Sequence, residues 1–158
     1  MWNKIKYYVF SIVATLAVGG LSAFFTAGNR DVYEKVTTPP LSPPSWLFPV
    51  AWTILYILMA ISFSRVYIKR KNEPMMRRNA VNIYALNLFF NFFWSIIFFD
   101  FEAYLLAFVW LLILWLIIFV MLINYYRTDK TAGLLLVPYL AWVTFAGYLN
   151  LGIFVLNR

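Results

Sequence analysis

Five long apolar runs occupy most of this chain, and they decide what it can fold into. They cover about residues 5–25, 46–67, 79–99, 103–126 and 131–156. Each run has the roughly 20 residues that a helix needs to cross the hydrocarbon core of a bilayer. A backbone in lipid must hydrogen-bond within its own segment, and the runs lack the strict alternation of barrel strands. The sequence therefore predicts an all-α integral membrane protein, a bundle of five transmembrane helices.

Composition indicates one membrane domain, residues 1–158, without a soluble domain. Of the 158 residues, 64% are hydrophobic and only 12% are charged. A soluble domain of this size could not cover so much apolar surface with so few charges. The chain also contains no cysteine and no histidine. Their absence excludes disulfides, metal sites built on Cys or His, and a Ser-His-Asp triad.

The first run shares features with a secretory signal peptide, because Lys4 and Lys6 precede it and small residues follow it. Its apolar core of about 20 residues is longer than the usual signal-peptide core. We therefore expect a transmembrane helix here, with a cleaved signal peptide as the alternative.

The basic residues are distributed unequally between the two sides of a five-span chain. Only Arg30, Lys35 and Arg158 fall on one side. The positive-inside rule therefore places the N-terminus in the cytoplasm, and the loop after the first span and the C-terminus outside. Charges that flank spans indicate contact with membrane lipids and not with nucleic acid. The remaining basic residues share the other side: Lys4, Lys6, Arg65, Lys69, Arg70, Lys71, Arg77, Arg78, Arg127 and Lys130.

The loop between the first two runs is the longest connection, and it is rich in proline. It contains Pro39, Pro40, Pro43 and Pro44. Proline stiffens a chain toward extended geometry, and a long loop among short ones is usually functional. We favour a functional lid over a simple spacer.

The third run carries a polar stripe. Asn87, Asn91 and Ser95 are spaced four residues apart and share one helix face, with Trp94 beside them. Amides are costly in hydrocarbon unless they find partners, so the stripe must face the interior of the bundle. Two interpretations remain open, helix–helix hydrogen bonding and the lining of a cavity.

The fifth run predicts a second inward face, near a helix kink at Pro138. Small residues beside a tryptophan there suit either a cavity or close packing. Its members are Tyr139, Trp142, Ala146, Leu149 and Asn150.

The second run adds an inward stripe of Trp52, Tyr56 and Met59. The other tryptophans suit the membrane boundary and the lipid: Trp2 and Trp46 the interfacial belt, Trp110 and Trp115 the lipid-facing surface.

The first run carries small residues at four-residue spacing: Gly19, Ala23 and Ala27. Such a face predicts a packing seam within the bundle, with a dimer face as the alternative.

Three stretches of the chain resemble the tryptophan-rich sensory protein family, also called the translocator protein family. They are residues 39–56 (PPLSPPSWLFPVAWTILY), 91–99 (NFFWSIIFF) and 138–150 (PYLAWVTFAGYLN). The resemblance implies a five-helix bundle with an internal ligand pocket, closed by the proline-rich loop as a lid. It implies porphyrins such as protoporphyrin IX and haem as ligands, and, from some members of the family, other hydrophobic ligands such as sterols and benzodiazepine-type drugs.

The resemblance and the stripes together define the candidate ligand-binding residues. They are Pro43, Pro44, Trp46, Trp52, Tyr56, Asn87, Phe90, Asn91, Trp94, Ser95, Trp142, Ala146 and Leu149. The sterol motif of animal members has no counterpart, because the first basic residue after Tyr148 is Arg158. Asn82 and Leu86 stand near the place where some members dimerise through small residues, so a homodimer stays an open alternative.

These features predict a receptor or sensor of porphyrins in a prokaryotic cell membrane, with no obligatory cofactor and porphyrin as ligand or substrate. The first alternative is light- and oxygen-dependent porphyrin degradation, with Trp52 and Trp142 as the catalytic rings. No acid–base pair for conventional catalysis is visible. The second alternative is a transporter of tetrapyrroles or lipids.

Overall fold

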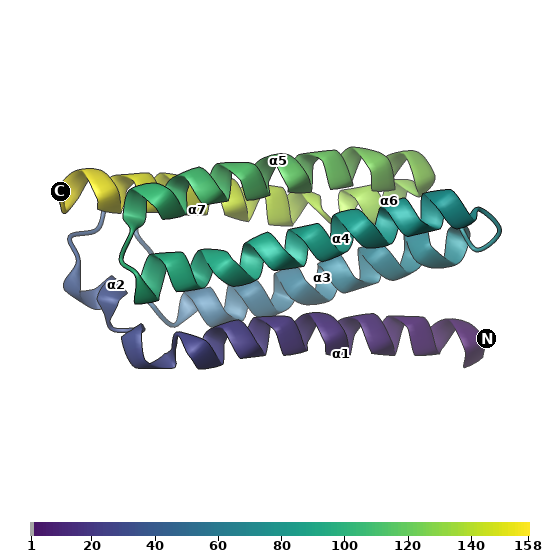
Figure 1. The fold of residues 1–158 in the computed structure, drawn as a ribbon, viewed down its shortest axis with the longest axis horizontal. Helices are drawn as coiled ribbons and strands as arrows, with labels where there is room; N and C mark the ends of the chain where they lie inside the picture. Colours follow the sequence, from purple (N-terminus) through teal and green to yellow (C-terminus); the bar gives the residue numbers. More distant parts are fainter. Residues whose placement is uncertain (1) are drawn as a thin grey trace.

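The protein is a bundle of five membrane-length helical segments (Figure 1). The computed structural model describes residues 2–158, with side chains from Lys4 onward, so the expected position of Trp2 in the belt lies outside the described side chains. The five segments confirm the predicted all-helical membrane fold. They are built from α1 (Trp2–Phe25), α3 (Leu47–Lys69), α4 (Pro74–Ser95) with the π-helical turn η2 (Ile96–Asp100), α5 (Tyr104–Thr128), and α6 (Lys130–Leu134) with α7 (Val137–Leu156).

The third span begins earlier than its apolar run, at Pro74 and not near residue 79. Proline suits the first turn of a helix because no N–H is needed there. The Arg77 N–H donates to the Glu73 carbonyl at 2.9 Å and closes this turn. The polar first turn extends beyond the apolar part of the helix, so hydropathy alone could not place its start.

The last span is interrupted between α6 and α7, as Pro138 predicted. Pro138 lies in the first turn of α7, and α6 ends at Leu134, four residues earlier. A proline ring cannot donate to that carbonyl and collides with it, which accounts for the interruption between Leu134 and Val137.

Helix α1 packs along α3 through a glycine. A Cβ atom added to Gly19 would collide with the ring of Tyr56. Ser11 Oγ also donates to the Ala60 carbonyl of α3 at 3.2 Å, and Thr15 is hydrogen-bonded to Tyr84 of α4. The small-residue face at Gly19 is therefore a packing seam inside the bundle.

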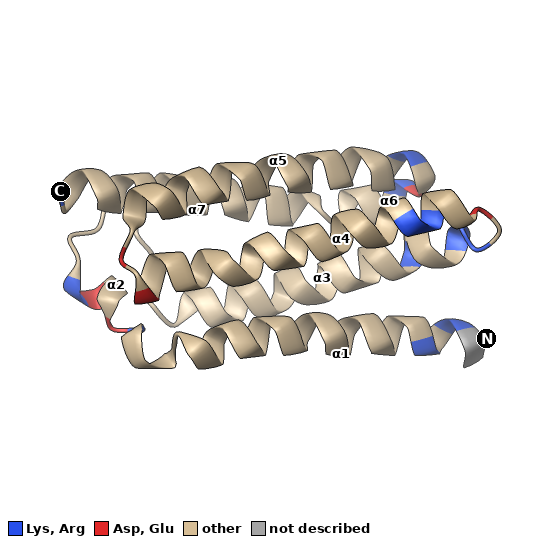
Figure 2. Ribbon diagram, viewed as in Figure 1, with Lys and Arg blue, Asp and Glu red and all other residues tan. Residues whose placement is uncertain are grey.

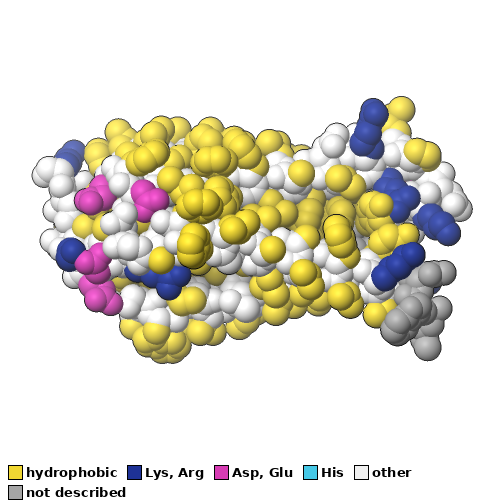
Figure 3. Space-filling model, turned by 60° about the horizontal axis from the view of Figure 1, so that its bottom comes forward, with side chains coloured by type: hydrophobic (Ala, Val, Ile, Leu, Met, Phe, Trp, Pro, Cys, Tyr) yellow, Lys and Arg dark blue, Asp and Glu magenta, His cyan; other side chains and the backbone are white. Residues whose placement is uncertain are grey.

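The apolar side chains form both the core and the outer belt. Met59, Leu114, Ile118 and Tyr139 are fully buried or nearly so. Large apolar residues such as Phe10 cover the outside, and charged side chains gather at the two ends (Figure 3). This distribution is the one that a bilayer requires of a spanning bundle.

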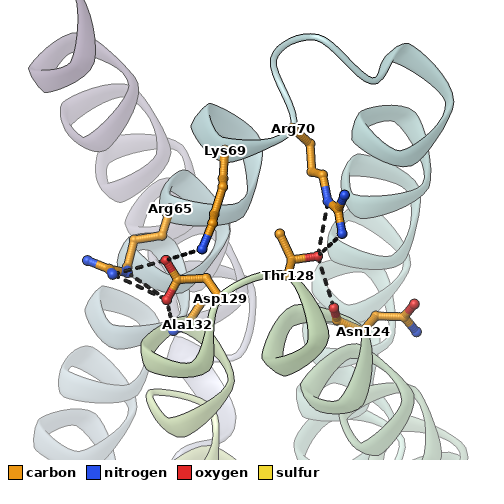
Figure 4. A network of polar contacts seen from close by, with 7 residues as sticks. All are labelled: Arg65, Lys69, Arg70, Asn124, Thr128, Asp129 and Ala132. Carbon is orange, nitrogen blue, oxygen red and sulfur yellow. Dashed lines mark hydrogen bonds and ion pairs between the residues drawn. The ribbon is translucent and has the colours of Figure 1, made fainter.

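Asp129 joins three helices at the end of the bundle where the basic residues gather (Figures 2 and 4). Its carboxylate accepts the Ala132 N–H at 3.1 Å and so caps α6. It also lies 3.0 Å from Arg65 Nη2 and 3.7 Å from Lys69 Nζ, both on α3. Because Asp129 follows α5 directly, this one side chain fixes α3 against the α5–α6 corner.

The surroundings of Asp129 favour its charged form. Partial burial raises the pKa of this carboxyl. The Ala132 hydrogen bond and the neighbouring Arg65 and Lys69 lower the pKa, and together they outweigh the effect of burial. The net pKa lies below the usual carboxyl value. A carboxyl with a lowered pKa stabilises the folded state at pH values above its ordinary pKa, which is about 4. This stabilisation is lost as the pH falls through the lowered pKa.

We therefore expect Asp129→Asn and Asp129→Ala to separate the charge from the cap. Asparagine caps a helix about as well as aspartate, so Asp129→Asn removes only the ion pairs and flattens the loss of stability below pH 4. Asp129→Ala costs about 1 kcal/mol more, because it also removes the cap. Thermal unfolding of detergent-solubilised protein across a pH series measures both effects. Equal stability of the two variants would contradict the assigned cap.

Candidate functional site

A cavity of about 600 Å³ lies at the end of the bundle opposite the basic cluster. Four helices and the loop between α1 and α3 enclose it, and small residues of α1 leave the space open. A Cβ atom at Gly20 would meet no atom within 4 Å. The lining includes Gly20, Ala23, Arg30, Glu34, Trp46, Phe48, Trp52, Tyr56, Trp94, Ser95, Phe98, Ala146 and Leu149.

Two indole rings form the aromatic wall of this cavity. The ring centroids of Trp52 and Trp94 are 6.4 Å apart, and the Trp52 centroid lies 5.6 Å from that of Tyr56. Trp94 donates its indole N–H to Asn150 Oδ1 at 3.2 Å, and Asn150 donates in turn to the Tyr104 carbonyl. These bonds fix the plane of Trp94, whereas Trp52 is half-buried and presents part of its ring to the cavity.

A chain of hydrogen bonds supports the wall from behind. Tyr56 Oη donates to Asn91 Oδ1, Asn91 Nδ2 donates to Tyr139 Oη, and Tyr139 Oη donates to Asn87 Oδ1, each at 2.8 Å. Asn87 Nδ2 points to the sulfur of Met59. The two asparagines are buried and lie outside the cavity lining, so the polar stripe of α4 bonds helices together and positions Tyr56.

The proline-rich loop is packed onto the end of α7. A Cβ atom at Gly152 would lie 2.5 Å from Pro39 Cγ, so only glycine admits the loop here. Asn157 donates to the Thr37 carbonyl at 2.8 Å and accepts the Thr37 N–H at 2.9 Å. Tyr148 Oη donates to the Pro40 carbonyl at 2.7 Å. The loop thus covers the end of the bundle as an ordered structure.

Pro43 and Pro44 hold the lid near the cavity but do not line it. Tyr33 Oη donates to the Pro43 carbonyl at 2.9 Å. Leu41 adopts a left-handed backbone with φ of 67° and is 85% exposed. Such a conformation is unusual for a branched residue and marks the sharp turn of the lid.

The mouth of the cavity is charged. Arg30, Asp31 and Glu34 belong to its lining. Asp31 is paired with Lys35, and Glu34 accepts from Ser45 Oγ at 2.8 Å. Arg30 donates to the Ala23 carbonyl at 2.9 Å and pairs with no carboxylate among the described residues. The guanidinium is therefore available to an anion.

Trp142 and Phe90 lie away from the cavity. Trp142 lines a separate open groove of about 400 Å³ between α3 and α7, with Pro138. Its indole nitrogen is buried without a hydrogen-bond partner among the described residues. Phe90 stacks on Trp110 between α4 and α5, with ring centroids 4.4 Å apart. The cavity thus unites Trp46, Trp52, Tyr56, Trp94, Ser95, Ala146 and Leu149 of the predicted set.

Sequence reasoning missed Arg30, Glu34 and Gly20, and it did not foresee the hydrogen bonds of two tryptophans. The lid charges looked like ordinary loop residues, and their only signal was their position beside the proline-rich segment. Trp110 and Trp115 are half-buried and donate their N–H groups to the Phe90 carbonyl and to Thr144 Oγ1. The sequence did not reveal these hydrogen bonds, which supply the acceptor that an indole N–H requires in hydrocarbon.

Comparison with known proteins identifies the relatives of this bundle. The TspO/MBR family model matches residues 11–156. The chain is 39% identical over 145 residues to the tryptophan-rich protein TspO of Chlorobaculum tepidum, covering 90% of each chain. It is 38% identical over 150 residues to the protein of the same name in Archaeoglobus fulgidus, covering 94% of this chain and 95% of that one. It is 29% identical over 142 residues to the translocator protein of Bos taurus, covering 89% and 83%.

The chain therefore belongs to the TspO/MBR family, a family of tryptophan-rich membrane proteins.

We expect Tyr139→Phe to destabilise the bundle by about 2 kcal/mol. The change leaves the amide of Asn91 and the carbonyl of Asn87 buried without partners, and orphaned groups cost about 1–3 kcal/mol each. Tyr148→Phe is the matched control, because it removes a hydroxyl that bonds the lid at an exposed position. Thermal unfolding in detergent compares the two. Equal losses would contradict the role assigned to the buried hydrogen-bond chain.

Proposed function

We propose that this protein is a membrane receptor that binds a porphyrin in the cavity beneath the lid. The observation that carries the proposal is the combination of an aromatic wall with an unpaired guanidinium at the mouth of the cavity. A volume of about 600 Å³ falls within the usual range for ligand pockets of this kind. The family resemblance implies porphyrins such as protoporphyrin IX and haem.

The chemistry of a porphyrin matches the two ends of the cavity. Its macrocycle is large, flat and apolar, and it would stack on Trp52 against the fixed ring of Trp94. Its propionates are anionic, and they would meet Arg30, which has a planar fork suited to carboxylates. Ala146 and Gly20 keep the opposite sides open. The names of the relatives, which speak of sensing and translocation, are compatible with a bound small molecule.

We expect Gly20→Leu to weaken porphyrin binding by about tenfold. The new side chain enters open space in the cavity, and crowding of this size costs about 1–3 kcal/mol. Gly28→Leu is the control, because a Cβ atom there also meets nothing and Gly28 does not line the cavity. Titration of the purified protein with protoporphyrin IX, followed by tryptophan fluorescence, gives both dissociation constants. If the two variants bind equally, the cavity is not the binding site.

A second candidate function is light-driven porphyrin degradation, and the surroundings of Trp52 favour it. The Trp52 centroid lies 6.2 Å from that of Tyr139 and 5.6 Å from that of Tyr56. An electron from Trp52 to the light-excited macrocycle would leave an indole radical cation and a porphyrin radical anion. The radical anion would add O2, and both oxygen atoms would stay on the macrocycle as two carbonyl groups when one of its C=C bonds breaks. The extra electron would then return from this product to the oxidised indole. The neighbouring phenols are the nearest groups that could relay this electron back to the indole.

In illuminated, aerated samples we expect Trp52→Phe to slow porphyrin loss to the rate seen in empty detergent micelles, because phenylalanine is much harder to oxidise. Trp115→Phe should leave the rate unchanged, since Trp115 does not line the cavity. Absorbance of the bound porphyrin follows the reaction at saturating protein. Equal rates for Trp52→Phe and wild type would remove this function while leaving porphyrin binding intact.

We also propose that the N-terminus is cytoplasmic and that the lid and the C-terminus lie outside a prokaryotic cell membrane. The basic cluster at the end opposite the lid supports this orientation (Figure 2). The chain has no native cysteine, so single cysteines report cleanly. In intact cells we expect an impermeant maleimide to label Ser42→Cys and to spare Lys71→Cys until the membrane is opened. The reverse pattern would invert the orientation.

A further inference from the structure

At the end of the bundle opposite the lid, a basic side chain lies over the ring of each of two tyrosines. The ring centroids of Tyr7 on α1 and Tyr67 on α3 lie 5.4 Å apart. Lys6 Nζ lies 5.5 Å from the Tyr7 centroid, and the guanidinium carbon of Arg77 on α4 lies 3.7 Å from the Tyr67 centroid. Three helices thus contribute to one cluster of Lys6, Tyr7, Tyr67 and Arg77, which we call the cation–tyrosine shelf.

Arg77 lacks an acceptor within the described part of the chain. Its Nε is buried and makes no hydrogen bond there. The two acidic residues of this end are already engaged, Glu73 with Arg70 and Asp129 with Arg65 and Lys69. A buried donor without an acceptor costs free energy, so an acceptor from outside the chain is favoured.

The position of Arg77 at the start of α4 adds to this imbalance. The N-terminus of a helix carries partial positive charge, and a cation there is unfavourable. The first turn of α4 contains no acidic residue, and Glu73 makes no side-chain cap. An anion held at the shelf would offset both the guanidinium and the helix terminus.

We propose that the cation–tyrosine shelf binds the phosphate of one anionic phospholipid. The shelf lies where α1, α3 and α4 reach the basic end of the bundle (Figures 1 and 2). The ends of membrane spans lie at the level of the lipid headgroups. The ring of Phe63 lies one turn deeper, with its centroid 5.5 Å from that of Tyr67, and continues the shelf into the apolar zone beside an acyl chain. The guanidinium binds the phosphate in its planar fork, while Lys6 adds a second positive charge.

Lipid binding to the delipidated full-length protein tests this proposal. Native mass spectrometry in detergent is run with phosphatidylglycerol and with phosphatidylcholine of the same acyl chains. We expect one retained phosphatidylglycerol, and about tenfold weaker retention in Arg77→Gln. Arg78→Gln is the matched control, because it removes the same charge from the next, exposed residue, and its site stays occupied. Arg77→Lys should restore part of the affinity.

Three outcomes would overturn the proposal. Equal losses in Arg77→Gln and Arg78→Gln would show only diffuse attraction to the charged end. Equal retention of phosphatidylcholine and phosphatidylglycerol would show that the site does not distinguish an anionic headgroup from a zwitterionic one. Displacement of the lipid by excess inorganic phosphate would show that a free anion is the ligand. Tyr67→Leu keeps every charge and removes the ring beneath Arg77. Weaker lipid binding by this variant would show that the aromatic ring, and not only the positive charge, contributes to the site. The unfolding midpoint of each variant shows that it is folded.

Discussion

The hydrogen bonds of Tyr139 hold together the buried centre of the bundle. Its hydroxyl accepts from Asn91 and donates to Asn87, and Tyr56 completes the chain from α3. These polar groups are buried, and each would be costly to leave unpaired in an apolar interior. Helices α3, α4 and α7 must therefore meet at the same depth in the bundle, each turned so that its polar side chain faces the other two. The Trp52 ring, which lies edge-on to Tyr139, takes its position from this arrangement.

The cavity exists because α1 approaches the other helices closely at one level and not at the next. Gly19 lies against the Tyr56 ring, so the backbone of α1 is in contact there. At Gly20 and Ala23 the side chains are too small to fill the space that faces Trp52. The lid then covers the end, tied to α7 at Gly152. The same small-residue face thus closes the bundle on one side and opens a pocket on the other.

The sequence predicted the spans and the inward faces well, because both follow from periodic polarity. It placed Asn87 and Asn91 inside, and both are buried. It could not separate Trp142 from Ala146, since four-residue spacing fixes a helix face only approximately and a large ring can lean to either side of it. The hydrogen bonds between Thr37 and Asn157 join residues 120 positions apart, so no local sequence pattern could predict them. The availability of Arg30 depended on the pairing of its neighbours, which only the folded chain determines.

The tryptophans fall into two groups, according to whether the indole N–H donates a hydrogen bond to an acceptor of the protein. Trp94, Trp110 and Trp115 each donate to an acceptor of the protein, so their rings are fixed parts of the helix contacts. The indole nitrogen of Trp142 is buried without an acceptor among the described residues, and neither the half-buried Trp52 nor the exposed Trp46 donates to one of them. A ring that only fills space could be phenylalanine, whereas a tryptophan whose N–H bonds nothing in the protein retains a donor and an easily oxidised ring. Of these three, Trp46 and Trp52 line the cavity, and only Trp52 is half-buried within the bundle, so the chemistry of a ligand there would fall first on Trp52.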